Sequence, residues 1–140
     1  MNQEDFPPVS PEALKSFKEN SPRIIKKTVD ALMSILKKIE SDEMSRELLN
    51  RGLEFPTRIL ESAMLVGEIS ILDDQLSWAC DRLPHDGVTL ENILLMLELY
   101  QKEIKKTLKN EHNSQIIPYV DWMITWQKEY IKKANIQESI

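Results

Sequence analysis

The chain has 140 residues, the size of one domain, and its hydrophobic and charged fractions of 41% and 29% are ordinary for a globular protein. The formal net charge of −5 disfavours nucleic-acid binding, which requires a basic face. One cysteine excludes an intramolecular disulfide and a cysteine metal cluster, and no apolar run approaches the roughly 20 residues that span a bilayer. With three glycines and no alternating apolar pattern, the sequence predicts an all-α protein. Its acidic, proline-rich N-terminus is unlike a signal peptide and predicts a cytoplasmic location.

The N-terminal part of the sequence predicts an arm followed by two helices. Residues 1–9 are expected to form a flexible arm that precedes a single domain over residues 10–140. Ser10-Pro11 and Ser21-Pro22 are each typical of a helix N-terminus, where a hydroxyl caps the helix and proline occupies its first turn. We therefore expect a short helix and then a second helix over residues 22–40.

Glycine and proline divide the middle of the chain. A short helix is predicted over residues 43–51, and Gly52 is the residue type that commonly follows a helix end. Phe55-Pro56 predicts a corner, because the residue before proline disfavours the α conformation. Further helices are expected over residues 57–66 and 68–83.

The segment Arg82–Lys109 contains the most apolar predicted helix. A corner at Pro84–Gly87 and a cap at Thr89 precede this helix. Its apolar residues cover more than one face. We therefore expect one face to meet the core and the other, around Leu90 and Leu94, to meet a second subunit in a homodimer.

The C-terminal part predicts a polar turn at residues 110–114 and a last helix over residues 115–134. The whole chain then contains about six to eight helices of mixed length. Helices of a plain four-helix bundle are usually similar in length, so the mixture favours a globin-like packing.

Few residues in the sequence point to chemistry. There is no G-x-S-x-G, no H-E-x-x-H and no glycine-rich phosphate loop, so we expect neither an enzyme nor a metal site. His85 is either a haem ligand or a polar corner residue, and its position before the helix favours the corner. Arg58 and Arg82 lie on apolar helices, where each either binds a ligand carboxylate or forms a surface ion pair. Four methionines on inward faces predict either core packing or an adaptable apolar pocket; they are Met33, Met64, Met96 and Met123.

The second half of the chain carries a family resemblance. A helix end is followed by Gly87-Val88, then by a long apolar helix with Tyr100 near its middle, and then by the closing segment IIPYVDWMITWQKEYI. The run Leu76–Tyr130 thus resembles the N-terminal sensor domain of RsbR-type stressosome co-antagonists, which are haem-less globin-fold domains. RsbR-type proteins continue into an output domain. A sensor domain of this size without one is similar to the plasmid-encoded sporulation-inhibitory proteins of the anthrax bacillus group.

The resemblance implies a haem-less globin fold that binds a fatty acid in an apolar tunnel, a chloride ion nearby, and a homodimer. It also implies inhibition of sporulation by competition with a similar histidine-kinase sensor domain for ligand or partner. On this hypothesis Arg58, Arg82 or His85 binds the head group of the fatty acid. The tunnel is lined by Leu60, Met64, Met96, Leu97, Tyr100 and Met123. The alternatives are a helical dimerisation module without ligand and a haem-binding globin sensor.

Overall fold

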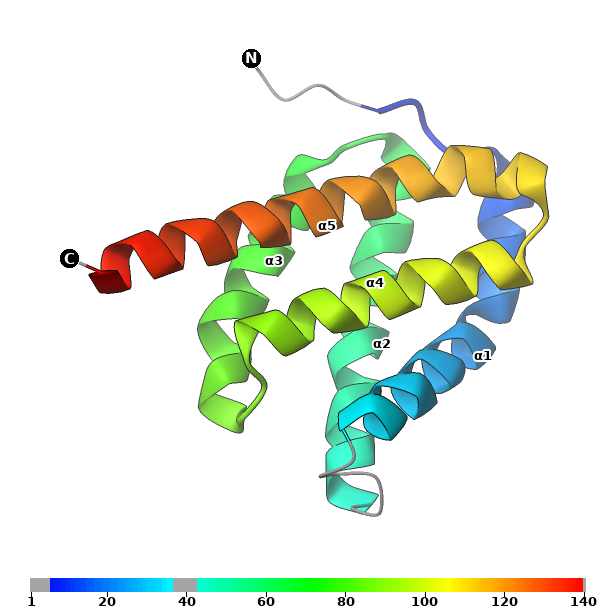
Figure 1. Cartoon of the computed structure of the whole chain (residues 1–140). Helices are drawn as coiled ribbons and strands as arrows, with labels where there is room; N and C mark the ends of the chain where they lie inside the picture. The colour runs from blue at the N-terminus through cyan, green and yellow to red at the C-terminus, as the bar shows by residue number, and fades with distance from the viewer. Residues whose placement is uncertain (1–5, 37–42, 140) are drawn as a thin grey trace.

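The computed structural model describes residues 6–36 and 43–139, and this part of the chain is helical and contains no β-strand. The elements are α1 (Pro11–Leu36), α2 (Glu43–Val66), α3 (Ser70–Arg82), the short 3-10 helix η1 (Leu83–Asp86), α4 (Leu90–Thr107) and α5 (Asn110–Ser139) (Figure 1). The all-α prediction is confirmed. The sequence predicted six to eight helices, and the described residues form five α-helices and one short 3-10 helix, because several predicted breaks lie inside continuous helices.

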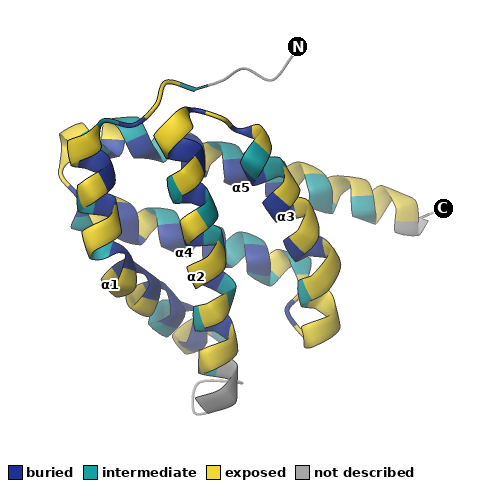
Figure 2. Cartoon of the chain, turned by 180° about the vertical axis from the view of Figure 1, so that it is seen from behind, coloured by how far each residue is buried: buried dark blue, intermediate teal, exposed yellow. Residues whose placement is uncertain are grey.

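The helices pack around one apolar core. α4 and α5 lie side by side and run in opposite directions, and α1 packs on α4 as well (Figure 1). α2 and α3 lie behind this pair, and the buried faces of the helices point inward (Figure 2). The C-terminal part of α5 extends beyond α3 and is largely exposed (Figure 2). No helix in the described part of the chain combines the length and the apolar character needed to cross a lipid bilayer.

The predicted boundary at Ser21-Pro22 is wrong, because α1 continues through Pro22. Proline in a helix interior removes one backbone hydrogen bond. Two neighbouring side chains bind carbonyl groups in this turn: Asn20 Nδ2 donates to the carbonyl of Ser16 at 2.8 Å and Ser21 Oγ to that of Phe17 at 2.7 Å. The cap at Ser10 is confirmed, since its Oγ accepts the backbone N–H of Ala13 at 3.2 Å. The predicted end of this region at residues 37–40 lies outside the described residues.

The predicted boundaries at Gly52 and Phe55-Pro56 are also wrong, because α2 contains all three residues. An interior glycine costs about 1 kcal/mol and an interior proline about 3 kcal/mol relative to alanine. Burial of Leu49, Leu53 and Leu60 on one face of α2 outweighs these costs, since each buried leucine contributes about 1.5–3 kcal/mol.

The start of α4 agrees with the sequence prediction. Gly87 has a φ of 91°, which only glycine adopts readily, and ends η1. Thr89 Oγ1 then accepts the backbone N–H of Asn92 at 3.1 Å. One face of α4 is buried, while Leu90 and Leu94 are half-buried and pack against the same core. Because α1 and α5 both pack on α4, the chain itself covers much of the apolar surface that we assigned to a second subunit.

The polar turn predicted at residues 110–114 is helical, because α5 begins at Asn110. Asn113 links the start of α5 to the end of α4. Its Nδ2 donates to the carbonyls of Lys105 and Leu108, both at 3.1 Å, and so satisfies groups at the C-terminus of α4. A residue that looks like a turn former in the sequence therefore joins two helices.

Part of the expected N-terminal arm packs on the helices, and residues 1–5 lie outside the description. Phe6 contacts the Tyr119 ring edge-on at a centroid distance of 5.1 Å, and Tyr119 Oη donates to the carbonyl of Pro7 at 2.9 Å. Val9 is buried, and its N–H donates to the carbonyl of Met64 at 2.9 Å. Residues 6–9 thus connect the end of α2 to α5.

Candidate ligand-binding groove

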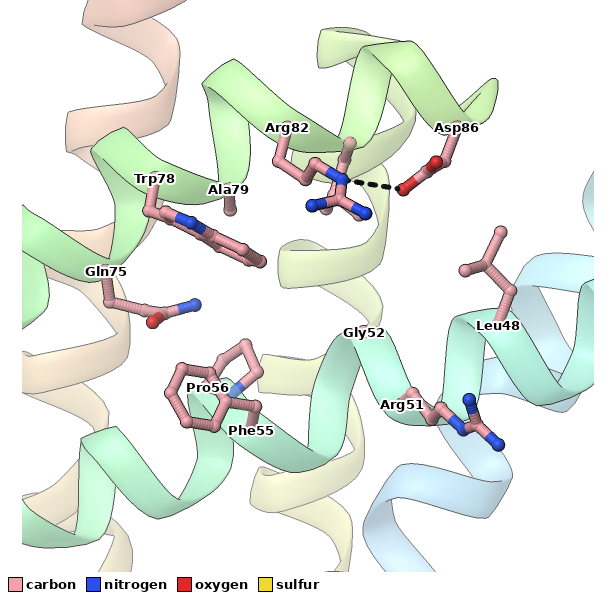
Figure 3. A pocket seen from close by; sticks show the side chains of 11 residues that line it. Leu48, Arg51, Gly52, Phe55, Pro56, Gln75, Trp78, Ala79, Arg82 and Asp86 are labelled. Carbon is pink, nitrogen blue, oxygen red and sulfur yellow. Dashed lines mark ion pairs between the residues drawn. The ribbon is translucent and has the colours of Figure 1, made fainter.

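An apolar groove of about 300 Å³ lies between α2 and the α3–η1 segment, and we call it the α2–α3 groove (Figure 3). Trp78 on α3 faces Phe55 and Pro56 on α2, and Arg82 points into the space between the two helices (Figure 3). The lining residues are Leu48, Arg51, Gly52, Phe55, Pro56, Gln75, Trp78, Ala79, Arg82, Leu83 and Asp86.

The helical repeat places these residues on the groove. On α2 the lining positions 48, 51, 52, 55 and 56 recur at helical spacing, and on α3 so do positions 75, 78, 79 and 82. Gly52 leaves room in the middle of the groove, since a Cβ atom built there meets no atom within 4 Å. Phe55 and Trp78 are 50% and 54% exposed, so two large aromatic side chains remain half solvated at this site.

Arg82 points into the groove, whereas Arg51 lines it with its guanidinium directed away from α3, and each arginine has an acidic neighbour (Figure 3). Arg82 Nε is 3.5 Å from Asp86 Oδ2, and Arg51 Nη2 is 3.4 Å from Glu47 Oε2. Both pairs are exposed, and exposed ion pairs contribute only about 0–1 kcal/mol. A ligand carboxylate in the groove can therefore compete with Asp86 for Arg82, which offers a bidentate contact.

The residues expected to line a tunnel are all buried. Leu60, Met64, Met96, Leu97, Tyr100 and Met123 are all buried in the main apolar cluster, and the α2–α3 groove is lined by none of them. The hydroxyl groups of Tyr100 and Thr57 are hydrogen-bonded at 2.7 Å. Burial raises the pKa of Tyr100 far above its usual value, although the hydrogen bond to Thr57 acts in the opposite direction. The prediction that all four methionines face inward is confirmed.

The three expected head-group residues lie at different places. Arg82 lines the groove. Arg58 is exposed on α2 near Glu61; burial raises the pKa of Glu61, while the positive charges of Lys18 and Arg58 act to lower it. His85 is exposed in η1, which does not favour haem ligation, because an axial ligand must face an enclosed apolar cavity. Among the described residues, no group of three or more His, Cys, Asp and Glu side chains is arranged to hold a metal ion.

The sequence-based prediction missed Phe55 and Trp78. A signal for Phe55 exists if α2 is read as one continuous helix. Leu48 and Phe55 then share a face that is distinct from the face of Leu49 and Leu53, and this second apolar face has no predicted partner. Because the sequence predicted a helix end before Gly52, Leu48 and Phe55 were not placed on one helix face.

Two side-chain hydrogen bonds join the other side of α3 to α5. Trp126 Nε1 donates to Asp73 Oδ1 at 2.6 Å. The Cys80 thiol donates to Gln127 Oε1 at 3.1 Å, and Gln127 Nε2 donates to the carbonyl of Leu90 at 3.2 Å. Burial raises the pKa of the Cys80 thiol, so this group stays protonated and remains a donor.

Comparisons with protein-family models and with curated proteins found no match for the chain.

Proposed function

We propose that the protein is a globin-like, haem-less sensor domain that binds a fatty acid in the α2–α3 groove. The observation that supports this proposal is the composition of the groove. Its apolar walls, which include Phe55 and Trp78, suit an acyl chain, and Arg82 suits a carboxylate.

The size of the groove favours a chain of modest length. A volume of about 300 Å³ is at the lower end of the range for ligand pockets. Each CH₂ group removed from water contributes about 0.8 kcal/mol, so a chain of about twelve carbons gains substantial affinity even when part of it stays solvated. This proposal places the ligand in a groove between two helices, whereas the sequence predicted a tunnel.

The signalling role rests on the resemblance of Leu76–Tyr130 to RsbR-type sensor domains. We propose that the protein inhibits sporulation signalling by competing with a similar histidine-kinase sensor domain for fatty acid or for a partner. The chloride ion that the resemblance implies requires a cation, and the two groove arginines are suitable.

Binding of dodecanoate tests the proposal directly. We expect isothermal titration calorimetry to give one site per chain, and Arg82→Gln to weaken binding about tenfold through loss of one charge-assisted contact. Arg23→Gln, which removes an exposed arginine on α1 away from the groove, should leave the affinity unchanged. Absence of binding in calorimetry, together with no fatty acid in native mass spectra of the purified protein, would refute it.

A homodimerisation module is the second candidate, and an exposed apolar pair favours it. Leu65 and Val66 at the end of α2 are 60% and 55% exposed and adjacent in sequence. Sedimentation velocity should detect a dimer that Leu65→Glu converts to a monomer. A wild-type monomer at micromolar concentration would remove this candidate.

A further inference from the structure

The two sides of helix α3 have different neighbours: one side lines the groove, and the other is hydrogen-bonded to α5. Gln75, Trp78, Ala79 and Arg82 form one wall of the α2–α3 groove. Asp73 and Cys80 hold Trp126 and Gln127 of α5. Any displacement of α3 at the groove therefore changes the geometry of its hydrogen bonds to α5.

The α3–η1 segment is bounded by two glycines with positive φ. Gly67 precedes it with a φ of 74° and Gly87 follows it with a φ of 91°. These are the positive-φ glycines of the described residues, and such positions absorb backbone rotation at low steric cost. The two ends differ, since a Cβ atom on Gly67 would lie 2.4 Å from the carbonyl oxygen of Phe6, whereas Gly87 is open. Backbone rotation at Gly67 is therefore restricted by this contact, whereas rotation at Gly87 is not.

We infer that the α3–η1 segment couples the occupancy of the groove to the C-terminal end of α5; this inference rests on the proposed function of the groove. A ligand or side chain that fills the groove packs on the half-exposed Phe55 and Trp78, so α3 shifts relative to α2. Because Asp73 and Cys80 lie on the opposite side of α3, the same shift breaks the Asp73–Trp126 and Cys80–Gln127 hydrogen bonds. The Trp126 ring stacks on the Tyr130 ring at a centroid distance of 5.3 Å. Loss of the Trp126–Asp73 hydrogen bond therefore also frees the part of α5 that extends beyond α3.

Linkage gives this coupling a definite sign. If ligand binding breaks the contacts between α3 and α5, then weakening those contacts must tighten ligand binding by the same factor. Trp126→Phe removes the indole N–H that Asp73 accepts, at a position outside the groove. We expect it to tighten dodecanoate binding about tenfold, the equivalent of one hydrogen bond to a charged group. Trp122→Phe is the matched control, because Trp122 is a half-buried tryptophan on the same helix, and it should leave the affinity unchanged.

A second experiment needs no fatty acid and so separates the failure of the coupling from the failure of the proposed function. Gly52→Phe places an aromatic ring in the groove, where the backbone has room for a side chain, and Gly52→Ala is its control without a ring. Hydrogen–deuterium exchange should then be about tenfold faster over residues 126–139 in Gly52→Phe than in Gly52→Ala. Gly52→Leu replaces the phenylalanine variant if that variant does not fold.

The two experiments have distinct outcomes. Unchanged exchange over residues 126–139 in a folded, groove-filled variant overturns the coupling even if dodecanoate binds. Faster exchange in that variant, together with no dodecanoate binding by the wild-type protein, supports the coupling and refutes the fatty-acid proposal. Equal or weaker dodecanoate binding by Trp126→Phe contradicts the sign of the coupling.

Discussion

The core around Tyr100 and the α2–α3 groove lie on opposite sides of α2, and they differ in how far apolar side chains are buried. On one side of α2, Leu60 is fully buried and the Thr57 hydroxyl is paired with Tyr100. On the other side, Phe55 remains 50% exposed beside an open volume of about 300 Å³. The comparison teaches that a buried apolar residue reports on folding, whereas a half-exposed aromatic residue beside a hollow is the better indicator of binding.

The largest effect is expected where the core loses volume. Leu60→Ala should lower the free energy of unfolding by about 3 kcal/mol, because it leaves a cavity in a region with 0% exposure. Leu65→Ala on the same helix, at 60% exposure, should change it by about 0.5 kcal/mol or less. Urea denaturation measures both. Similar values for the two variants would contradict the distinction between core and surface.

A smaller loss is expected when one partner of the buried hydroxyl pair is removed. Tyr100→Phe should cost about 1–2 kcal/mol, because the Thr57 hydroxyl stays buried without its partner. Adding Thr57→Val removes that group as well. The loss in free energy of unfolding in the double variant should therefore be smaller than the sum of the losses in the two single variants. A strictly additive double-mutant cycle, measured by thermal unfolding, would argue that the hydrogen bond is unimportant.

In the groove, binding and stability should separate. Trp78→Ala should lower the free energy of unfolding by less than about 1 kcal/mol, since the side chain is 54% exposed. It should also weaken dodecanoate binding at least about tenfold, because the acyl chain loses an aromatic wall. Ile35→Ala, at 53% exposure on α1, is the control that should leave the affinity unchanged. If both variants bind with wild-type affinity, the ligand site lies elsewhere.

The smallest effect concerns charge between α1 and α2. Burial acts to raise the pKa of Asp30, but hydrogen bonds from Arg46 and Lys26 outweigh it and hold that pKa below its usual value. Asp30 therefore stabilises the fold above the unfolded-state pKa of about 3.9, and this contribution is lost as the pH falls through the lower folded-state pKa. Because the side chain is 41% exposed, Asp30→Asn should cost only about 0.5 kcal/mol at pH 7. Thermal melts of both proteins should converge as the pH falls below the folded-state pKa, and a difference that stays constant through acid pH would contradict this assignment.

The sequence predicted the core better than the groove, for physical reasons. The inward stripes follow the helical period, and the caps at Ser10 and Thr89 follow from local hydrogen bonding, so all of these are visible in a single segment. Helix continuity at Gly52 and Pro56 depends on tertiary burial of neighbouring leucines, which local propensity does not contain.

The groove could not be predicted from the sequence, because it depends on how α2 and α3 are placed relative to each other. Leu48, Phe55 and Trp78 are ordinary apolar residues in the sequence, and only the packing of α3 on α2 brings them to one hollow. Gln127 is a similar case. It is 0% exposed, and its two partners come from α3 and from the start of α4, so no sequence window contains the reason for its burial.

The contacts of the N-terminal segment have a consequence for the order of folding during synthesis. The backbone N–H of Ser10 donates to the side chain of Gln115, and the carbonyl of Pro7 accepts from Tyr119, partners that are 105 and 112 residues away. Pro7 and Ser10 are synthesised more than one hundred residues before these partners, so they find them only after α5 has emerged, and closure of such a long loop is slow. A nascent chain stalled before residue 115 should thus keep residues 6–10 open to proteases, and release of the completed chain should protect them.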